Sequence, residues 1–178
     1  AGNCIIDDAV TCKAANAEII RRYYTGLCDN RKGLISDEEV MKLKLFMKQA
    51  NITPDDRKVI AAALAKEAET GAPAAAMELP DGTIITGKTS NLLMSPDVIE
   101  PIQNLKVQHL GNNNPRIHTD ETLIALSICA NTDPNAKKAM EQLSKLRGCE
   151  VHSTVILSQV DERTFKRLGI NLTCEPKY

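Results

Sequence analysis

The sequence contains no tryptophan and few aromatic residues of any kind. Of its 178 residues three are Tyr and two are Phe, whereas apolar residues make up 43%. This apolar content excludes an intrinsically disordered chain. The shortage of rings predicts a core of Ile, Leu, Val, Ala and Met. The length allows one domain, or one and a half, with a core of useful size.

The sequence also lacks a surplus of charge of either sign. Its formal net charge is −1 and its isoelectric point is near 6.4. A nucleic-acid binder needs a basic surplus to neutralise phosphates, so we expect no nucleic-acid partner. Adjacent basic residues come in nothing longer than pairs such as Arg21 and Arg22, and a solvent-exposed helix face explains that pair.

Long apolar runs and paired cysteines are missing as well. No run approaches the roughly 20 residues that cross a bilayer, and no secretory signal is present, so we expect no membrane partner. The six cysteines are scattered without a CxxC pair, which predicts reduced thiols and a cytoplasmic location. The chain starts with Ala1 rather than Met, and we interpret it as the C-terminal piece of a longer protein.

Residues 1–72 read as a helical segment. An apolar stripe at helical spacing follows Asp7 or Asp8 and runs to about Asn30. Ser36 and Glu39 spell a capping box ahead of a second helix, and Pro54 begins a third that ends near Gly71. We interpret the segment as a packing layer or an oligomerisation surface, and we expect a homo-oligomer.

Residues 73–178 read as a mixed domain. Its predicted elements, in order, are a hairpin over 76–86, helices over 95–111, 119–130 and 134–147, a strand over 150–157, a short helix capped by Asp161 and a strand over 170–174. The fold class predicted for the whole chain is therefore α+β. A helix-rich N-terminal segment precedes a small sheet, made of the hairpin and two C-terminal strands, packed with helices.

The residues from Gly82 to Thr89 match the phosphate-loop pattern G-x-x-x-x-G-K-[ST]. We discount a full nucleotide loop because the four central residues, Thr-Ile-Ile-Thr, prefer to form a strand, with Gly82 in a tight turn. A partial contact with phosphate remains open. It would use Lys88, Thr89 and Ser90 at the start of a helix.

A dense polar run precedes the helix predicted over 119–130. Arg116 offers a planar donor fork suited to carboxylate or phosphate, and His118 follows two residues later. No turn chemistry requires this pair, so we predict that both contact a ligand and that Asn113 or Asn114 orients it. The acidic residues that follow are explained by helix capping.

The strand predicted over 150–157 carries Glu150 and His152 on one face and Cys149, Val151 and Ser153 on the other. We take His118 and His152 as the candidate catalytic residues. The three histidines follow no known metal-ligand spacing, so no metal ligand and no cofactor is assigned. A thiolate pair of Cys149 with a histidine also remains open, although a buried structural cysteine is the commoner outcome.

Two long stretches carry a resemblance to a known family. The first is Ser95-Pro96-Asp97-Val98-Ile99-Glu100-Pro101-Ile102-Gln103, continuing to NPRIHTDETLIALSICA, and the second is GCEVHSTVILS continuing to LGINLTCEPKY. Both are similar to the uncharacterised bacterial family "domain of unknown function 1846", as are AGNCIIDD and AEIIRRYY near the start. The resemblance covers essentially the whole chain.

The resemblance implies that this chain is the C-terminal part of a protein several times longer, whose activity is unassigned. It also implies that a family segment is absent here, because Leu93 runs straight into Met94 where the family continues through an Ala- and Leu-rich helix.

The leading hypothesis is a domain that binds a small anionic or phosphorylated molecule, as part of an enzyme. It requires Lys88, Arg116, His118 and His152 to surround one cavity. The alternatives are a structural or oligomerisation domain, and a metal-dependent hydrolase that uses both of these histidines and Asp120.

Overall fold

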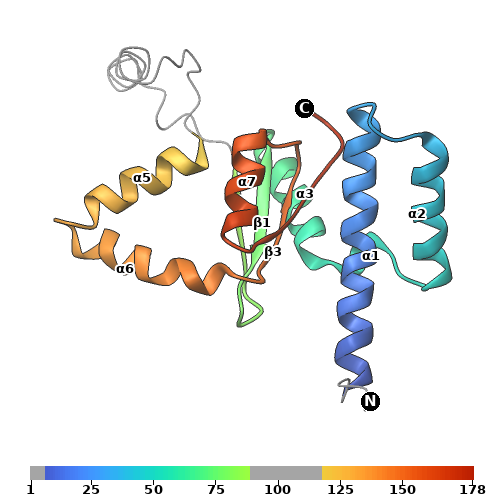
Figure 1. Ribbon diagram of the computed structural model, residues 1–178, viewed down its shortest axis with the longest axis horizontal. Helices are drawn as coiled ribbons and strands as arrows, with labels where there is room; N and C mark the ends of the chain where they lie inside the picture. Colours follow the sequence, from blue (N-terminus) through green and yellow to red (C-terminus); the bar gives the residue numbers. More distant parts are fainter. Residues whose placement is uncertain (1–6, 89–117) are drawn as a thin grey trace.

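The computed structural model describes residues 7–88 and 118–178. These residues form an α+β fold, as predicted, around one four-stranded sheet with helices on both faces (Figure 1). The strand order is β2-β1-β3-β4. The strands are β1 (Ala74–Glu78), β2 (Ile84–Lys88), β3 (Glu150–Ser153) and β4 (Asn171–Cys174). β1 is antiparallel to β2 and β3, whereas β3 and β4 are parallel.

The helices divide between the two faces of the sheet. They are α1 (Asp8–Arg31), α2 (Asp37–Gln49), the 3-10 turn η1 (Pro54–Asp56), α3 (Lys58–Thr70), α5 (Thr119–Cys129), α6 (Pro134–Gln142), the 3-10 turn η2 (Leu143–Leu146) and α7 (Gln159–Arg167). Helices α1, α2 and α3 lie on one side of the sheet and α7 on the other, and α5 and α6 extend away as an arm (Figure 1). None of the helices in the described ranges is long and apolar enough to cross a bilayer.

The N-terminal helices begin where their caps predict. Asp7 accepts the backbone N–H of Val10, and Ser36 and Glu39 form the predicted capping box. The third helix is a correction to the prediction. Pro54 opens only η1, and α3 starts at Lys58, because the extended backbone of Arg57 (φ −113°, ψ 91°) separates them and its side chain turns into the interior.

Among residues 7–88 and 118–178, two apolar clusters lie on the α1–α3 side of the sheet. The first cluster joins α1, α2 and α3. Its buried members are Ile20, Tyr24, Met47, Ile52 and Ile60, of which Tyr24 alone is aromatic. Val59 and Ala63 of α3 pack on Ala76 of β1. A helix of the segment 1–72 therefore lies directly on the sheet. The predicted division of the chain at residues 72 and 73 stays a prediction.

The hairpin forms as predicted, and it accounts for the phosphate-loop pattern. Gly82 takes a positive φ of 82°, and the Leu79 N–H donates to the Thr83 carbonyl at 2.8 Å. Ile84 to Lys88 are strand residues paired with β1. The described part of the pattern is thus a turn and a strand, and no phosphate-wrapping loop forms there.

Several boundaries in the C-terminal half differ from the prediction, and the helix predicted over 134–147 is α6 as far as Gln142, followed by the 3-10 turn η2. β3 ends at Ser153 instead of residue 157, because the Ser153 hydroxyl donates to the Val155 carbonyl at 2.8 Å and the chain turns. Ser158, rather than Asp161, caps α7, and His118 is the N-cap of α5. Asp161 is the third residue of α7, and its carboxylate accepts the Thr119 N–H at 2.8 Å, so it serves α5 instead of its own helix.

Candidate functional site

The register of the sheet brings distant residues to one end of it. Lys88 pairs with Ala74, whose carbonyl accepts the Thr154 N–H at 2.8 Å. Lys88 therefore lies at the carboxyl end of β3. β4 runs parallel to β3 and ends on the same side. We call this edge the carboxyl end of the sheet.

His118 lies at this carboxyl end too, because it contacts the start of α7, the helix that follows β3. Its Nδ1 is 3.3 Å from the Ser158 Oγ and 3.4 Å from an oxygen of Asp161. The Ser158 hydroxyl in turn donates to Asp161 at 2.6 Å. The His118 side chain is 13% exposed. The N-termini of α5 and α7 therefore meet at one polar junction.

This Ser, His and Asp group does not have the geometry of a nucleophilic relay. In such a relay the serine and the aspartate contact opposite nitrogens of the imidazole. Here both approach Nδ1. Burial alone would raise the pKa of Asp161, but hydrogen bonds from Ser158 and Thr119 lower it below its usual value, so the carboxylate is held ionised. The junction ties the α5–α6 arm to α7.

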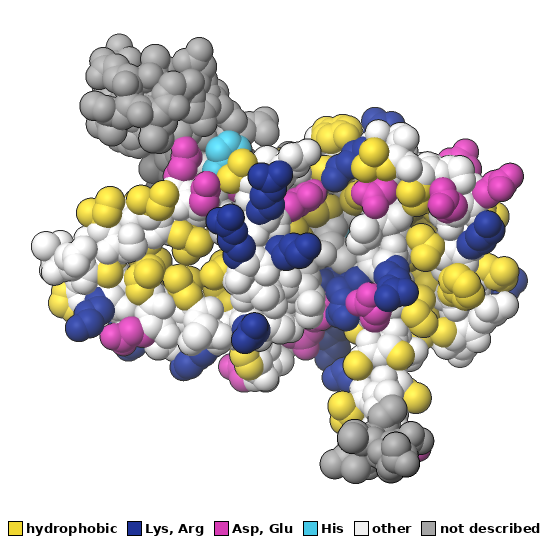
Figure 2. Space-filling model, viewed as in Figure 1, with side chains coloured by type: hydrophobic (Ala, Val, Ile, Leu, Met, Phe, Trp, Pro, Cys, Tyr) yellow, Lys and Arg dark blue, Asp and Glu magenta, His cyan; other side chains and the backbone are white. Residues whose placement is uncertain are grey.

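Charges of both signs surround the junction. The first turns of the two helices already carry four carboxylates, those of Asp120, Glu121, Asp161 and Glu162. Positive charge to attract an anion must therefore come from side chains rather than from the helix dipoles alone. Figure 2 shows Lys and Arg side chains gathered over α7, beside a histidine. The exposed basic residues of α7 are Arg163, Lys166 and Arg167.

His152 lies elsewhere, inside the layer between the sheet and α1. It has no exposed surface, and its ring packs edge-on against Tyr24 with centroids 5.0 Å apart. Its Nδ1 is 2.9 Å from the Thr173 hydroxyl and its Nε2 is 3.2 Å from Glu175. Because both ring nitrogens have hydrogen-bonding partners, packing and hydrogen bonding in the interior are enough to explain His152. The catalytic role predicted for it stays a prediction.

A buried ionic cluster adjoins His152 and was not predicted from the sequence. Arg57 is 4% exposed, and its Nε donates to Glu150 at 2.8 Å. Its other nitrogens donate to the Thr173 hydroxyl and to the carbonyls of Val151 and Asn171. Arg21 of α1 donates to the second oxygen of Glu150 at 2.7 Å. Glu150 and His152 share one face of β3, as predicted, and that face is where this cluster assembles.

The structure thus brings some predicted site residues together and separates others. Lys88 and His118 share the carboxyl end of the sheet. The contacts of His152 lie on the α1 side of the sheet, whereas those of His118 lie with α7 on the other side (Figure 1). Among residues 7–88 and 118–178, no group of three or more His, Cys, Asp or Glu could hold a metal ion. The other candidates, Thr89, Ser90, Asn113, Asn114 and Arg116, are outside the described residues.

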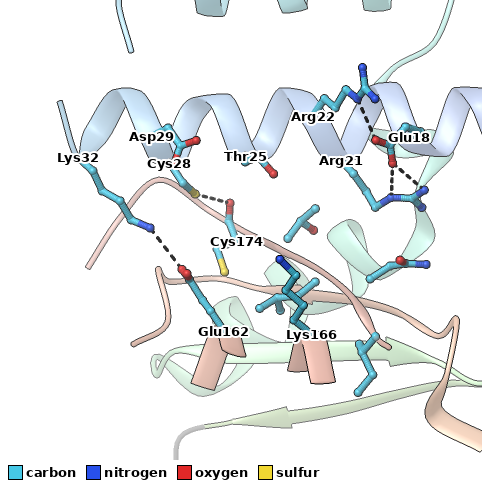
Figure 3. Close-up of a pocket in the computed structure, with 14 residues that line it drawn as sticks. Glu18, Arg21, Arg22, Thr25, Cys28, Asp29, Lys32, Glu162, Lys166 and Cys174 are labelled. Atoms are coloured by element: carbon cyan, nitrogen blue, oxygen red, sulfur yellow. Dashed lines mark hydrogen bonds and ion pairs between the residues drawn. The ribbon is translucent and has the colours of Figure 1, made fainter. Parts of the chain in front are cut away.

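A groove of 380 Å³ separates α1 from β4 and α7 (Figure 3). Lys32 pairs with Glu162 across it at 3.3 Å, and the Cys28 thiol donates to the Cys174 carbonyl at 3.2 Å. Lys166 points from α7 toward α1 (Figure 3). Glu18, Asp29 and Glu162 nearly balance the four basic residues of the lining, Arg21, Arg22, Lys32 and Lys166. The groove is therefore a charged joint between layers, with little net charge for an ionic ligand.

The fold and the junction define an α+β protein in which a parallel β3–α7–β4 unit carries a polar end. The chain belongs to the family described as "domain of unknown function DUF1846". The C-terminal model of that family matches residues 55–95 and 91–178, and the N-terminal model matches residues 1–51. The predicted family is thus confirmed, and the match extends to the N-terminal family model as well as the C-terminal one.

The relatives are uncharacterised bacterial proteins. A UPF0371 protein of Corynebacterium efficiens is 46% identical over 200 residues, which cover 99% of this chain and 40% of the relative. A UPF0371 protein of Corynebacterium glutamicum is also 46% identical, and one of Streptococcus pneumoniae is 44% identical, with the same coverage. The chain thus spans about 40% of the length of these curated relatives.

The comparisons also support the expected missing segment. The alignment with the relatives extends over 200 residues, more than the 178 residues of this chain. The two matches to the C-terminal family model meet at residues 91–95, the position of Leu93 and Met94. The relatives therefore carry residues that this chain lacks, and this junction is where the family match is interrupted.

Proposed function

We propose that this protein binds a small phosphorylated or otherwise anionic molecule at the carboxyl end of the sheet, as part of an enzyme. Lys88, Arg116 and His118 would contact the ligand, and Asn113 or Asn114 would orient it. Thr89 and Ser90 would add hydroxyl donors. The observation that carries the proposal is that Lys88 and His118, from the two ends of the segment 89–117, both lie at this end.

The location supports the proposal on general grounds. Ligands of open α/β sheets bind outside the carboxyl ends of parallel strands, next to the start of the following helix. Here β3 and β4 are parallel, and α7 starts beside His118. Lys88 supplies a cation to this end of the sheet, whereas Lys166 and Arg167 lie in the last turn of α7, away from its start. Positive charge is needed here because four carboxylates already occupy the first turns of the two helices.

His118 is the residue we propose for proton transfer. An imidazole can donate to or accept from a bound oxygen, and Ser158 and Asp161 orient this ring through Nδ1. The proposal does not depend on His152.

Calorimetric titration tests the proposal with inorganic phosphate, pyrophosphate, adenine nucleotides and sugar phosphates. We expect at least one to bind, and Arg116→Ala to weaken it by about tenfold or more, as the loss of a charge-assisted contact implies. Lys88→Ala should weaken the same ligand. Lys138→Ala, which removes an exposed charge on α6, is the matched control and should change nothing. Equal affinity of wild type and Arg116→Ala would refute the proposal.

We also propose a cytoplasmic location and a homo-oligomer. The first is supported by the free thiols of Cys12, Cys28, Cys129, Cys149 and Cys174. The second is supported by exposed apolar residues on α5, where Ile124 and Ile128 are 59% and 64% exposed. Light scattering measures the oligomer directly, and a monodisperse monomer at all concentrations would exclude it.

A further inference from the structure

Helix α2 carries apolar side chains on more sides than its contacts with the other described residues bury. Met47 is buried against α1, with 5% exposure. Met41 and Leu45 are 63% and 51% exposed, and Phe46 is 56% exposed. These three positions do not extend the buried stripe, because residues 45, 46 and 47 point to successive sides of a helix. A helix that is apolar on several sides is typically buried on several sides.

Hollows flank these exposed residues. One of 670 Å³ is lined by Met41, Leu45 and Ile52, with Lys44 and Lys48 also in the lining. Another of 450 Å³ is lined by Leu43, Phe46 and Ala50, among others. Apolar pockets of this kind accept apolar side chains of a partner, and lysines favour carboxylates around them.

The family match assigns this face to the N-terminal family region. The N-terminal family model matches residues 1–51, which include α1 and α2, whereas the sheet matches the C-terminal model. The chain covers only 40% of the length of the relatives. Much of the relatives' chain is therefore available to cover α2.

We infer that the exposed face of α2, made of Met41, Leu45 and Phe46, is the docking surface for the rest of the N-terminal family region in the longer proteins. The occupant inserts apolar side chains into the two hollows and places carboxylates near Lys44 and Lys48. This contact is intramolecular in a longer protein, and it is separate from the ligand site at the carboxyl end of the sheet.

Thiol labelling tests the inference. Phe46→Cys is made in this chain, and the same substitution is made at the aligned position of the full-length Corynebacterium efficiens relative. Labelling by iodoacetamide is followed by peptide mass spectrometry. We expect fast labelling in this chain and labelling slower by about 100-fold in the relative, because a packed side chain reacts only when it opens. Ile85→Cys, 48% exposed on β2, is the control and should label at similar rates in both.

Met41→Cys gives a second probe, in case one substitution disturbs folding, and circular dichroism checks each variant. Equal rates at position 46 in the two proteins would overturn the inference. Slow labelling in this chain itself, or protection in the relative that disappears on dilution, would also overturn it, because a second copy would then be the occupant.

Discussion

At the residue scale, Arg57 is the side chain on which the interior depends most. Burial lowers the pKa of its guanidinium, but Glu150 raises it, so the group keeps its charge. Removing one partner of a buried ion pair typically costs about 3–5 kcal/mol; because Glu150 keeps its contact with Arg21 after the change, the lower value of about 3 kcal/mol applies here. We expect Arg57→Ala to lower the free energy of unfolding by about that amount, measured by urea denaturation. Arg167→Ala, on the exposed face of α7, is the control, and equal losses in the two variants would contradict this account.

Asp161 gives a prediction about acid stability. Its pKa is lower in the folded protein than in the unfolded chain, so its stabilising effect is complete above the ordinary Asp pKa of about 3.9 and is lost as pH falls through the folded value. We expect Asp161→Asn to be less stable than wild type at pH 7 and the difference to shrink toward pH 3. Glu141→Gln, on the exposed side of α6, serves as control. A difference that grows at low pH would show the sign to be wrong.

The cysteines separate into reactive and protected thiols. Burial raises the pKa of Cys28 to about 12 and that of Cys174 to about 11. Cys12 and Cys129 are exposed. At pH 8 we expect iodoacetamide to modify the exposed pair in the folded protein and the buried pair only after denaturation. Modification of Cys28 as fast as Cys12, followed by mass spectrometry, would argue against the packing of α1 on β4.

The sequence could not reveal these residue roles because each depends on a distant partner. Arg57 follows two aspartates and precedes a lysine, a context typical of a surface turn, and its partner Glu150 is 93 residues away. Asp161 carries the local pattern of a cap, but it caps a helix 42 residues earlier. One weak indication of the buried polar cluster was present in the sequence, because Glu150 and His152 are two polar residues on one face of a predicted strand.

At the scale of elements, local chemistry predicted what local contacts determine. The hairpin follows from Pro80-Asp81-Gly82, and the start of α2 follows from Ser36 and Glu39. The break between η1 and α3 could not be predicted from local chemistry, because it accompanies the burial of the Arg57 side chain. The strand β3 was predicted too long, since Ser153 turns the chain with its own side chain.

The capping box gives the prediction at this scale. Loss of a serine cap costs about 1 kcal/mol, so Ser36→Ala should lower the free energy of unfolding by that amount. The reason is that the Glu39 N–H loses the Ser36 hydroxyl as an acceptor and keeps only the Ser36 carbonyl. Ser144→Ala, at an exposed position inside η2, is the matched control. Indistinguishable midpoints in urea for the two variants would show that α2 forms without its cap.

At the scale of the whole molecule, the sheet separates two polar systems. The ionic cluster of Arg21, Glu150 and Arg57 with His152 fills the α1 side, and the junction of His118, Ser158 and Asp161 lies on the α7 side. The sequence predicted that Lys88, His118 and His152 would line one cavity. In the structure Lys88 and His118 lie at one end of the sheet, and His152 lies apart from them. Strand pairing produced this separation, and no local pattern encodes which strands pair.

Nuclear magnetic resonance of the histidine side chains tests the ligand site most directly. With ring nitrogens labelled, His118 and His152 report separately on the two sides of the sheet. During titration with the anion that binds in calorimetry, we predict that the His118 resonances shift in a saturable way and those of His152 stay in place. A titration that shifts His152 and leaves His118 unchanged, or shifts neither, would contradict a ligand site at the carboxyl end of the sheet.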